Sequence, residues 1–218
     1  ETIPVLRQLD IWPEYVVCSN GAMLLKRDPL ADDGYVKHYI ETFNPAKVLN
    51  LIKGHLPDGK YAVEDEHGNY YFTEPLPGVD PTLMAHQVDF EGLLNLQATR
   101  VVVVSPDHDT EDFLQVVERI GLKQVSYSIG WAAWLDIAPE GVSKASALEK
   151  VREALDFPRS RLFAAGDGNN DIQMIEWAAE LGRGVAMGNA EPEIKAVANE
   201  VCGNVQDLGL LDALNKLP

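Results

Sequence analysis

The stretch Arg161-Leu-Phe-Ala-Ala-Gly-Asp-Gly-Asn-Asn-Asp171 decides the fold, because an apolar run turns abruptly into a polar loop. The apolar half predicts a buried strand over 161–165, and the pattern that follows predicts a helix over 170–181. Gly166 and Gly168 permit a tight turn and a close approach between the backbone and a ligand. Ligands of open α/β sheets gather at the carboxyl ends of the strands, so we expect a binding site at this loop.

The loop carries side chains that suit a metal ion and an anion. Asp167 and Asp171 are hard oxygen donors of the kind that Mg²⁺ prefers. Asn170 stands where the helix begins, so it either caps that helix or binds an anionic ligand. A turn whose polar residues only cap the helix is the alternative. Two acids and two asparagines within six residues favour the ligand site.

A lysine is predicted at the start of another helix, over 143–155. Lys144 lies in the first turn of that helix, where a cation opposes the helix dipole. An anion held by both the lysine and the helix N–H groups would remove that conflict. A solvated surface lysine is the alternative.

Strands and helices alternate in the last third of the chain, which is typical of βα units on a parallel sheet. The predicted strands there cover 133–137, 161–165 and 184–187, and the predicted helices cover 143–155, 170–181 and 192–201. Residues 22–136 have a different texture, with short alternating strands around a hairpin signal at 65–68. The elements predicted there are strands over 60–63, 69–73 and 101–104 and helices over 45–54 and 110–121. We expect this middle part to form an α+β unit.

Composition narrows the function classes. The chain has 218 residues and a formal net charge of −16, which opposes sequence-independent binding to nucleic acid or to an anionic membrane surface. No apolar run approaches the roughly 18 residues of a membrane span, so we expect a soluble chain. Two cysteines are too few for a disulfide framework, and a reducing cytoplasm is the expected location. Composition leaves the oligomeric state open.

A second strand end carries a polar turn. Residues 15–18 predict a short buried strand that opens into Ser19-Asn20-Gly21. A nucleophilic serine elbow is excluded, because Val17 stands where that motif requires glycine. Asn20 remains a candidate to face a substrate.

Three segments together resemble the haloacid dehalogenase (HAD) superfamily, specifically its Cof-type, subfamily IIB phosphatases. These segments are Val16–Ala22, Leu135–Lys144 and Gly166–Asp171, the last with Met174 and the following run Gly184–Ala190. The resemblance implies a Rossmann-like α/β core with a parallel sheet, formed by residues 1–21 and 137–218, and an inserted α+β cap over residues 22–136.

The resemblance also implies roles for individual residues. Asp167 would hold Mg²⁺ with Asp171 supporting that metal site, while Lys144 and Asn170 would hold the phosphoryl group. The cap would close over the substrate and select its leaving group.

One departure from the family pattern is large. Family members begin with Asp-x-Asp-Gly-Thr, which supplies the nucleophile and the general acid/base, and a second strand ends in Thr-Gly-Arg. Neither motif occurs in these 218 residues, so no residue here is assigned as nucleophile or general acid/base. Because the chain starts at Glu1 and both losses are at one end, we expect an N-terminal segment of the natural chain to be missing.

The resulting expectation is a magnesium-dependent phosphatase acting on a small phosphorylated metabolite, such as a sugar phosphate, through an aspartyl-phosphate. A phosphomutase-like phosphoryl transferase is one alternative. A non-catalytic module that binds a phosphorylated metabolite is the other, because the residues present could bind a ligand that nothing attacks.

Overall fold

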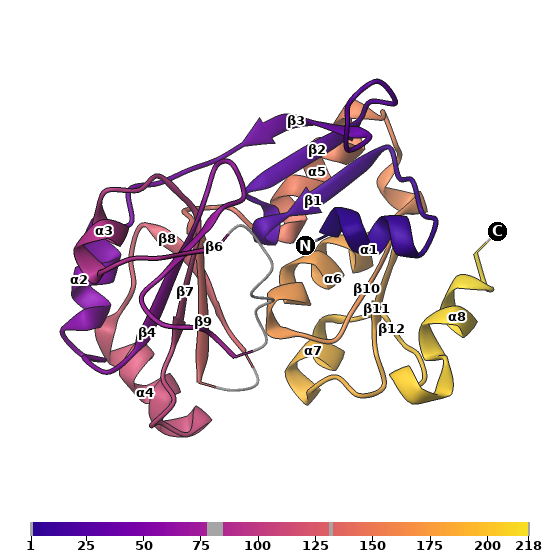
Figure 1. Ribbon diagram of the computed structural model, residues 1–218. Coiled ribbons are helices and arrows are strands. Elements are labelled where there is room, and N and C mark those ends of the chain that lie inside the picture. Colours follow the sequence, from indigo (N-terminus) through magenta and orange to yellow (C-terminus); the bar gives the residue numbers. More distant parts are fainter. Residues whose placement is uncertain (1, 78–84, 131–132, 218) are drawn as a thin grey trace. The chain divides into compact units, whose positions relative to one another are not determined.

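The protein is described by a computed structural model that covers residues 2–77, 85–130 and 133–217. Its contacts divide the chain into two compact units, Glu1–Val142 and Ser143–Pro218 (Figure 1). Among the described residues, no helix is long and apolar enough to cross a membrane.

The first unit begins with helix α1 (Thr2–Gln8) and a small antiparallel sheet in the order β1-β2-β3. Its strands are β1 (Tyr15–Cys18), β2 (Met23–Arg27) and β3 (Tyr35–Ile40). The turn between β1 and β2 is tight, because Ser19 and Asn20 both have a positive φ, of 50° and 52°. Strand β1 matches the predicted strand, whereas β2 and β3 were not predicted.

The rest of the first unit is built on a six-stranded sheet in the order β6-β5-β4-β7-β9-β8. The strands are β4 (Lys60–Asp65), β5 (Tyr70–Phe72), β6 (Ala85–Gln87), β7 (Ala98–Val104), β8 (Val125–Ile129) and β9 (Trp134–Pro139). Neighbouring strands are antiparallel except for β5 and β6. The predicted strands 60–63, 69–73 and 101–104 are confirmed within this sheet, and so is the turn at 65–68.

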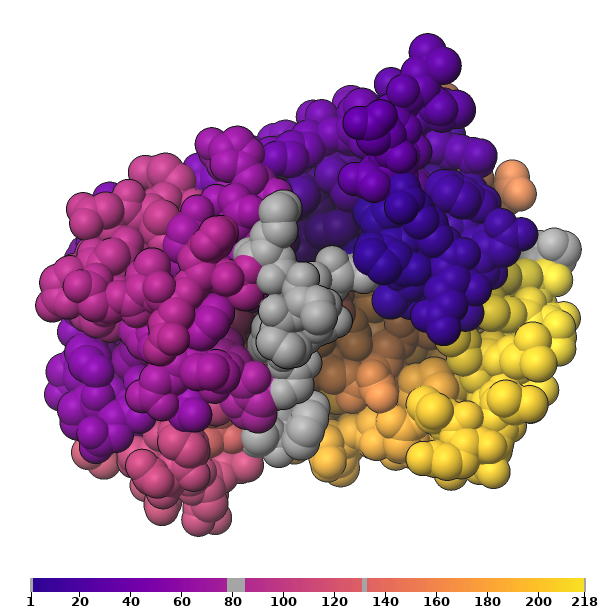
Figure 2. Space-filling model, viewed as in Figure 1, coloured from indigo at the N-terminus to yellow at the C-terminus, as the bar shows by residue number. Residues whose placement is uncertain are grey.

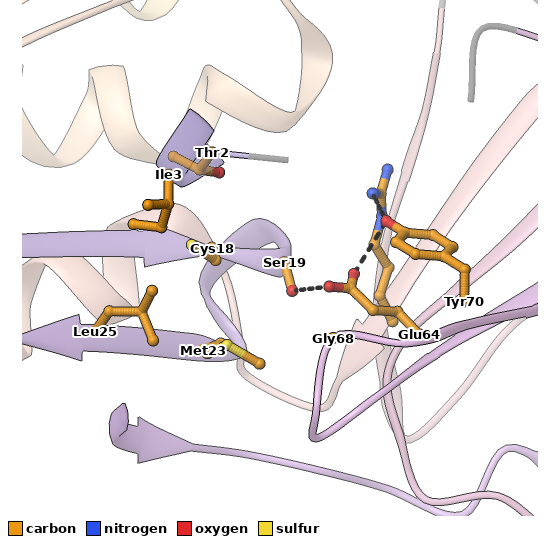
Figure 3. A pocket seen from close by; sticks show the side chains of 10 residues that line it. Thr2, Ile3, Cys18, Ser19, Met23, Leu25, Glu64, Gly68 and Tyr70 are labelled. Atoms are coloured by element: carbon orange, nitrogen blue, oxygen red, sulfur yellow. Dashed lines mark hydrogen bonds between the residues drawn. The ribbon is translucent and has the colours of Figure 1, made fainter. Parts of the chain in front are cut away.

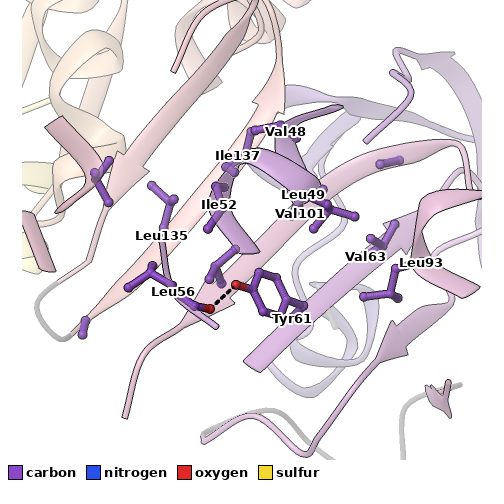
Figure 4. Packing of buried hydrophobic residues seen from close by; sticks show 14 of the residues in the cluster. Val48, Leu49, Ile52, Leu56, Tyr61, Val63, Leu93, Val101, Leu135 and Ile137 are labelled. Atoms are coloured by element: carbon purple, nitrogen blue, oxygen red, sulfur yellow. Dashed lines mark hydrogen bonds between the residues drawn. The ribbon is translucent and has the colours of Figure 1, made fainter. Parts of the chain in front are cut away.

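One face of this sheet is covered by helices α2 (Ala46–Lys53), α3 (Phe90–Leu94) and α4 (Thr110–Ile120) (Figure 1). Alternate residues of the strands point to this side, as the period of two in a strand requires. They include Tyr61, Val63, Val101, Leu135 and Ile137, all fully buried (Figure 4). Helices α2 and α4 confirm the predictions for 45–54 and 110–121.

The second unit holds a three-stranded parallel sheet in the order β10-β11-β12. The strands are β10 (Phe163–Gly166), β11 (Arg183–Ala186) and β12 (Glu200–Val201), and the helices are α5 (Lys144–Ala154), α6 (Ile172–Ala179), α7 (Pro192–Val197) and α8 (Gly209–Leu214). Ile175 of α6, Ala186 of β11 and Ile194 of α7 form its buried centre. Helix α8, yellow in Figure 2, has three leucines, and each of them is 40–50 % exposed.

Two sequence predictions need correction. The helix predicted over 192–201 ends at Val197, because Glu200 and Val201 leave it to pair with β11 as strand β12. The strand predicted over 133–137 is not part of the parallel sheet that holds the strands predicted over 161–165 and 184–187. It is β9, antiparallel to both β7 and β8, since apolar Leu135 and Ile137 pair with apolar Val103 and Val101 across the six-stranded sheet.

The predicted boundaries of core and cap remain a proposal. The contacts separate the chain after Val142, and they place β1 in the same unit as β2. The assignment of 1–21 and 137–218 to one core and of 22–136 to a cap is therefore taken up below with the function.

Candidate phosphate and metal site

The site of the second unit lies where β10 and β11 end. The two strands are parallel, and Gly166 pairs with Ala186 at their carboxyl ends. The loop with Asp167 follows β10, and the segment with Asn189 follows β11. Their backbones stay together, because Met187 N donates a hydrogen bond to Gly166 O at 3.0 Å. Two polar loops therefore meet at one edge of the sheet.

Asp171 fixes the shape of the loop after β10. Its side chain is nearly buried, with 8 % of the residue exposed. One carboxylate oxygen, Oδ2, accepts hydrogen bonds from the backbone N–H groups of Asp167 and Gly168, at 3.2 and 3.1 Å. Gly166 makes room for this carboxylate, since a Cβ added there would lie 2.5 Å from Cβ of Asp171. The Asp171 side chain thus folds back over its own loop.

Lys144 contacts the other oxygen of the same carboxylate. Helix α5 begins at Lys144 because Ser143 caps it, with Ser143 Oγ accepting from Ser146 N and Ser146 Oγ accepting from Ser143 N. Lys144 Nζ lies 2.6 Å from Asp171 Oδ1. Lys144 is the first residue of α5, where a cation opposes the helix dipole. The Asp171 carboxylate is the anion that offsets this unfavourable position.

A second cluster of charges holds α5 against α6 and so keeps Lys144 in place. Glu149 of α5 accepts hydrogen bonds from Arg152 and from Trp177 Nε1 of α6, the latter at 2.7 Å. Arg159 adds a longer ion pair to Glu149 at 3.5 Å. The hydrogen bond from Arg152, together with Trp177 and both arginine charges, lowers the pKa of Glu149 to about 2.

The Asp167 side chain differs from that of the buried Asp171 in its exposure and in its partner. It is exposed, and its Oδ2 accepts a hydrogen bond from Asn189 Nδ2 at 2.9 Å. Asn189 is itself oriented, because its Oδ1 accepts from Val205 N at 3.3 Å. Sequence reasoning gave Asn189 no role. Its position just after the predicted strand 184–187 could have indicated that role. Residues that follow neighbouring parallel strands lie at the same edge of the sheet, so Asn189 could have been expected near the loop that follows the strand 161–165.

The other predicted residues fall in two places. Asn170 lies in the 3-10 turn Asn169–Asp171 of the same loop. Its Oδ1 is so near Gly168 that a Cβ on this glycine would lie 2.9 Å from it. Asn20 belongs to the first unit, in the turn between β1 and β2, so its part in the site stays a prediction.

The donor set suits Mg²⁺ only in part. Within 2–77, 85–130 and 133–217, no three His, Cys, Asp or Glu side chains are placed to hold a metal ion together. Mg²⁺ commonly takes one or two carboxylates and completes its shell with waters and phosphate oxygens. An exposed Asp167 carboxylate oriented by an asparagine fits that partial role.

Comparison with known proteins gives matches across the chain. The chain is 25 % identical over 177 residues to 5-amino-6-(5-phospho-D-ribitylamino)uracil phosphatase YitU of Bacillus subtilis (strain 168), which is 80 % of this chain and 62 % of that protein. It is 41 % identical over 101 residues to pyridoxal phosphate phosphatase YbhA of Escherichia coli (strain K12), which is 44 % of this chain and 36 % of that protein. The chain thus spans less than two thirds of the length of either relative.

A solved HAD subclass IIB sugar phosphatase shares the fold, with a TM-score of 0.76 and 19 % identity over 99 % of this chain and 79 % of that one. The fold is therefore the mixed α/β architecture of these proteins, a Rossmann-like core with a cap domain. The family model of the haloacid dehalogenase-like hydrolases matches residues 1–214, and the chain belongs to that family.

Proposed function

We propose that this chain belongs to a magnesium-dependent phosphatase for a small phosphorylated metabolite. The observation that carries the proposal is the Lys144–Asp171 pair next to the exposed Asp167, at the carboxyl ends of β10 and β11. Membership of a hydrolase family and two relatives named as phosphatases support it.

Each residue of the loop has a part in the proposed chemistry. Lys144 has three N–H donors and uses one on Asp171, so the others can bind phosphoryl oxygens. Asn170 would donate to the same group. Asp171 positions Lys144, and Asp167, oriented by Asn189, would hold the metal. A bound Mg²⁺ would neutralise charge on the phosphoryl oxygens.

The attacking group of the proposed reaction is not among these 218 residues. In the proposal an aspartate attacks phosphorus in line, the leaving group departs with its oxygen, and water then hydrolyses the aspartyl-phosphate. The residues described here bind, orient and neutralise the phosphoryl group. The proposed cap, residues 22–136, would close over the substrate and select its leaving group, while 1–21 and 137–218 would form the core.

The substrate is proposed only as a class. The relatives carry names that differ in substrate, one a phosphorylated ribitylaminouracil and the other pyridoxal phosphate. What these substrates share is a phosphate ester on a small organic molecule, and the loop addresses that shared group.

A non-catalytic module that binds a phosphorylated metabolite is the second candidate. One observation favours it, namely that neither Asp-x-Asp-Gly-Thr nor another assigned nucleophile occurs in the 218 residues. In this case Lys144 and the acidic loop would bind the ligand without turnover.

A phosphatase assay on the purified natural protein separates the candidates. We expect orthophosphate release from small phosphate esters with Mg²⁺, its loss with EDTA, and its loss in Lys144→Met. Lys150→Met is the matched control, because Lys150 is exposed on the same helix. Activity that survives EDTA would refute the proposal, binding without release would favour the module, and a new sugar phosphate as product would indicate phosphoryl transfer.

A further inference from the structure

Strand β8 forms one edge of the six-stranded sheet in the first unit. Gly130 N donates a hydrogen bond to Trp134 O at 2.8 Å, so these two residues form a hydrogen-bonded pair next to the end of the β8–β9 ladder. Such pairs alternate with non-bonded pairs along antiparallel strands, so Ser126 and Ser128 also bond to β9. The backbone N–H and C=O of Tyr127 therefore point away from β9, to the side on which no described strand pairs with β8.

The side chains of β8 carry no charge. The strand Val125-Ser-Tyr-Ser-Ile129 contains no lysine, no proline and no acid, and its register with β9 runs without a bulge. Charges, prolines and bulges are the features with which sheet edges avoid pairing with another strand. Tyr127 is 45 % exposed, so the middle of this edge is open to a further strand.

The edge of the small sheet in the same unit shows the usual protection. Its edge strand β3 carries the exposed residues Lys37 and His38, and its register with β2 shifts between Leu24 and Leu25. Strand β8 has neither a charged side chain nor such a shift, so the absence of protection is particular to β8 and not a general property of the edges of this unit.

The charged side chain nearest to β8 on the neighbouring strand is paired within the unit. Asp136 of β9, which lies opposite Ser128, accepts a hydrogen bond from Arg100 Nε of β7 at 2.6 Å. The same guanidinium donates to Tyr70 OH at 3.1 Å, further across the sheet (Figure 3). The charge of Asp136 is therefore compensated where a further strand would approach.

The order of residue types in β8 is the same in both directions. In an antiparallel pairing of two copies centred on Tyr127, Ser126 lies opposite Ser128 and Val125 lies opposite Ile129. Hydroxyl groups thus face hydroxyl groups, and apolar side chains face apolar side chains. A two-fold interface requires this kind of self-complementarity, because the same patch serves on both subunits.

We propose that two copies of this chain associate through β8, which pairs antiparallel with the same strand of the partner subunit about a two-fold axis between the two Tyr127 residues. Tyr127 N–H of each copy then donates to Tyr127 O of the partner subunit. The net charge of −16 makes two copies repel each other, so an uncharged strand is a favourable place for them to meet. The inference is independent of the proposed phosphatase activity, because it concerns the association of copies.

Sedimentation velocity of the purified natural protein tests the proposal. A contact made by a single short strand buries little area, so the dimer should be weak, and protein concentrations from about 10 µM to about 1 mM cover the affinities of such interfaces. We expect the fraction of dimer to rise over this range. A wild-type protein that stays monomeric throughout would overturn the proposal.

Two double variants test the register. Ser126→Lys combined with Ser128→Lys places lysine opposite lysine across the two-fold axis, and it should weaken the dimer roughly tenfold although it lowers the net charge. Ser126→Glu combined with Ser128→Lys is the matched control, because it places opposite charges across the axis and should keep the dimer at least as tight as the wild type. Equal effects of the two double variants, or a wild-type dimer that neither of them changes, would overturn the pairing of β8 with itself.

Discussion

Lys144 Nζ and Asp171 Oδ1 are 2.6 Å apart, although 27 positions separate the two residues in the chain. The pair joins the first residue of α5 to the loop after β10, so the start of one helix and the turn of another βα unit are held at one place. The second oxygen of Asp171 binds two backbone N–H groups of its own loop. Asp171 therefore determines both where the lysine lies and how the loop turns.

Asp171→Asn should disturb the site more than a surface substitution would. The amide loses the charge-assisted contact with Lys144 and changes the acceptor for Asp167 N and Gly168 N. We expect a loss of about 1.5–3 kcal/mol in the free energy of unfolding, measured in urea. Asp212→Asn is the control, because Asp212 is exposed on α8. Equal stability of both variants would contradict this account of the loop.

Gly166→Ala should be destabilising although it adds a single methyl group. The new Cβ would lie 2.5 Å from Asp171 Cβ, so the loop or the strand must shift. We expect a cost of about 1–3 kcal/mol in thermal or urea unfolding.

Gly54→Ala provides the matched control for that substitution. Gly54 has helical dihedral angles, and a Cβ there would make only ordinary contacts at 3.5 Å or more. Gly54→Ala should leave stability unchanged or raise it slightly. If Gly166→Ala were equally harmless, the close packing of Gly166 against Asp171 would be disproved.

Glu149 predicts a dependence of stability on acid pH. Its pKa is about 2 in the folded protein against an ordinary 4.5, so its contribution is complete above pH 4.5 and is lost as the pH falls toward 2. Wild type should exceed Glu149→Gln in melting temperature near neutral pH, and the gap should close over that window. A gap that stays constant from pH 6 to the acid limit would argue against the arginine contacts as its cause.

The pair of Arg100 and Asp136 predicts non-additive effects in the first unit. Both side chains are mostly buried, with 19 % and 13 % exposed. Asp136→Leu alone should cost about 3–5 kcal/mol, because it leaves a buried guanidinium without its partner. The double variant with Arg100→Leu should recover much of that loss. Urea unfolding of the wild type, the two single variants and the double variant gives the coupling free energy between Arg100 and Asp136. If the costs of the two single substitutions simply added, the two side chains would not stabilise each other.

The sequence predicted most of the helices and strands that have a regular apolar spacing. It did not predict which strands pair with one another. Helices α2 and α4 and strands β4, β7, β10 and β11 follow from apolar spacing, which is a local property. Strands β2 and β3 were missed because Met23–Arg27 and Tyr35–Ile40 carry lysines and arginine beside their apolar residues. The antiparallel direction of β9 depends on β7 and β8, which no local pattern reveals.

Most residues of the candidate site could also be predicted from the sequence, whereas their contacts with one another could not. The loop 166–171 and Lys144 could be picked out from residue types and spacing, since acids, amides and glycines cluster there. Their mutual arrangement could not be, because the Lys144–Asp171 contact depends on how α5 packs on α6 through Glu149 and Trp177. The role of Asn189 as a partner of Asp167 likewise required the pairing of β10 with β11.

Divalent metal binding at Asp167 is the central claim, and Mn²⁺ in place of Mg²⁺ tests it most directly. Both ions favour oxygen ligands, and Mn²⁺ broadens the NMR signals of nearby amides. With inorganic phosphate present, the amides of Gly166–Asp171 and of Asn189 should broaden in the wild-type chain and in Asp212→Asn, and should stay sharp in Asp167→Asn. Broadening that is unchanged by Asp167→Asn, or that centres on other residues, would contradict the account.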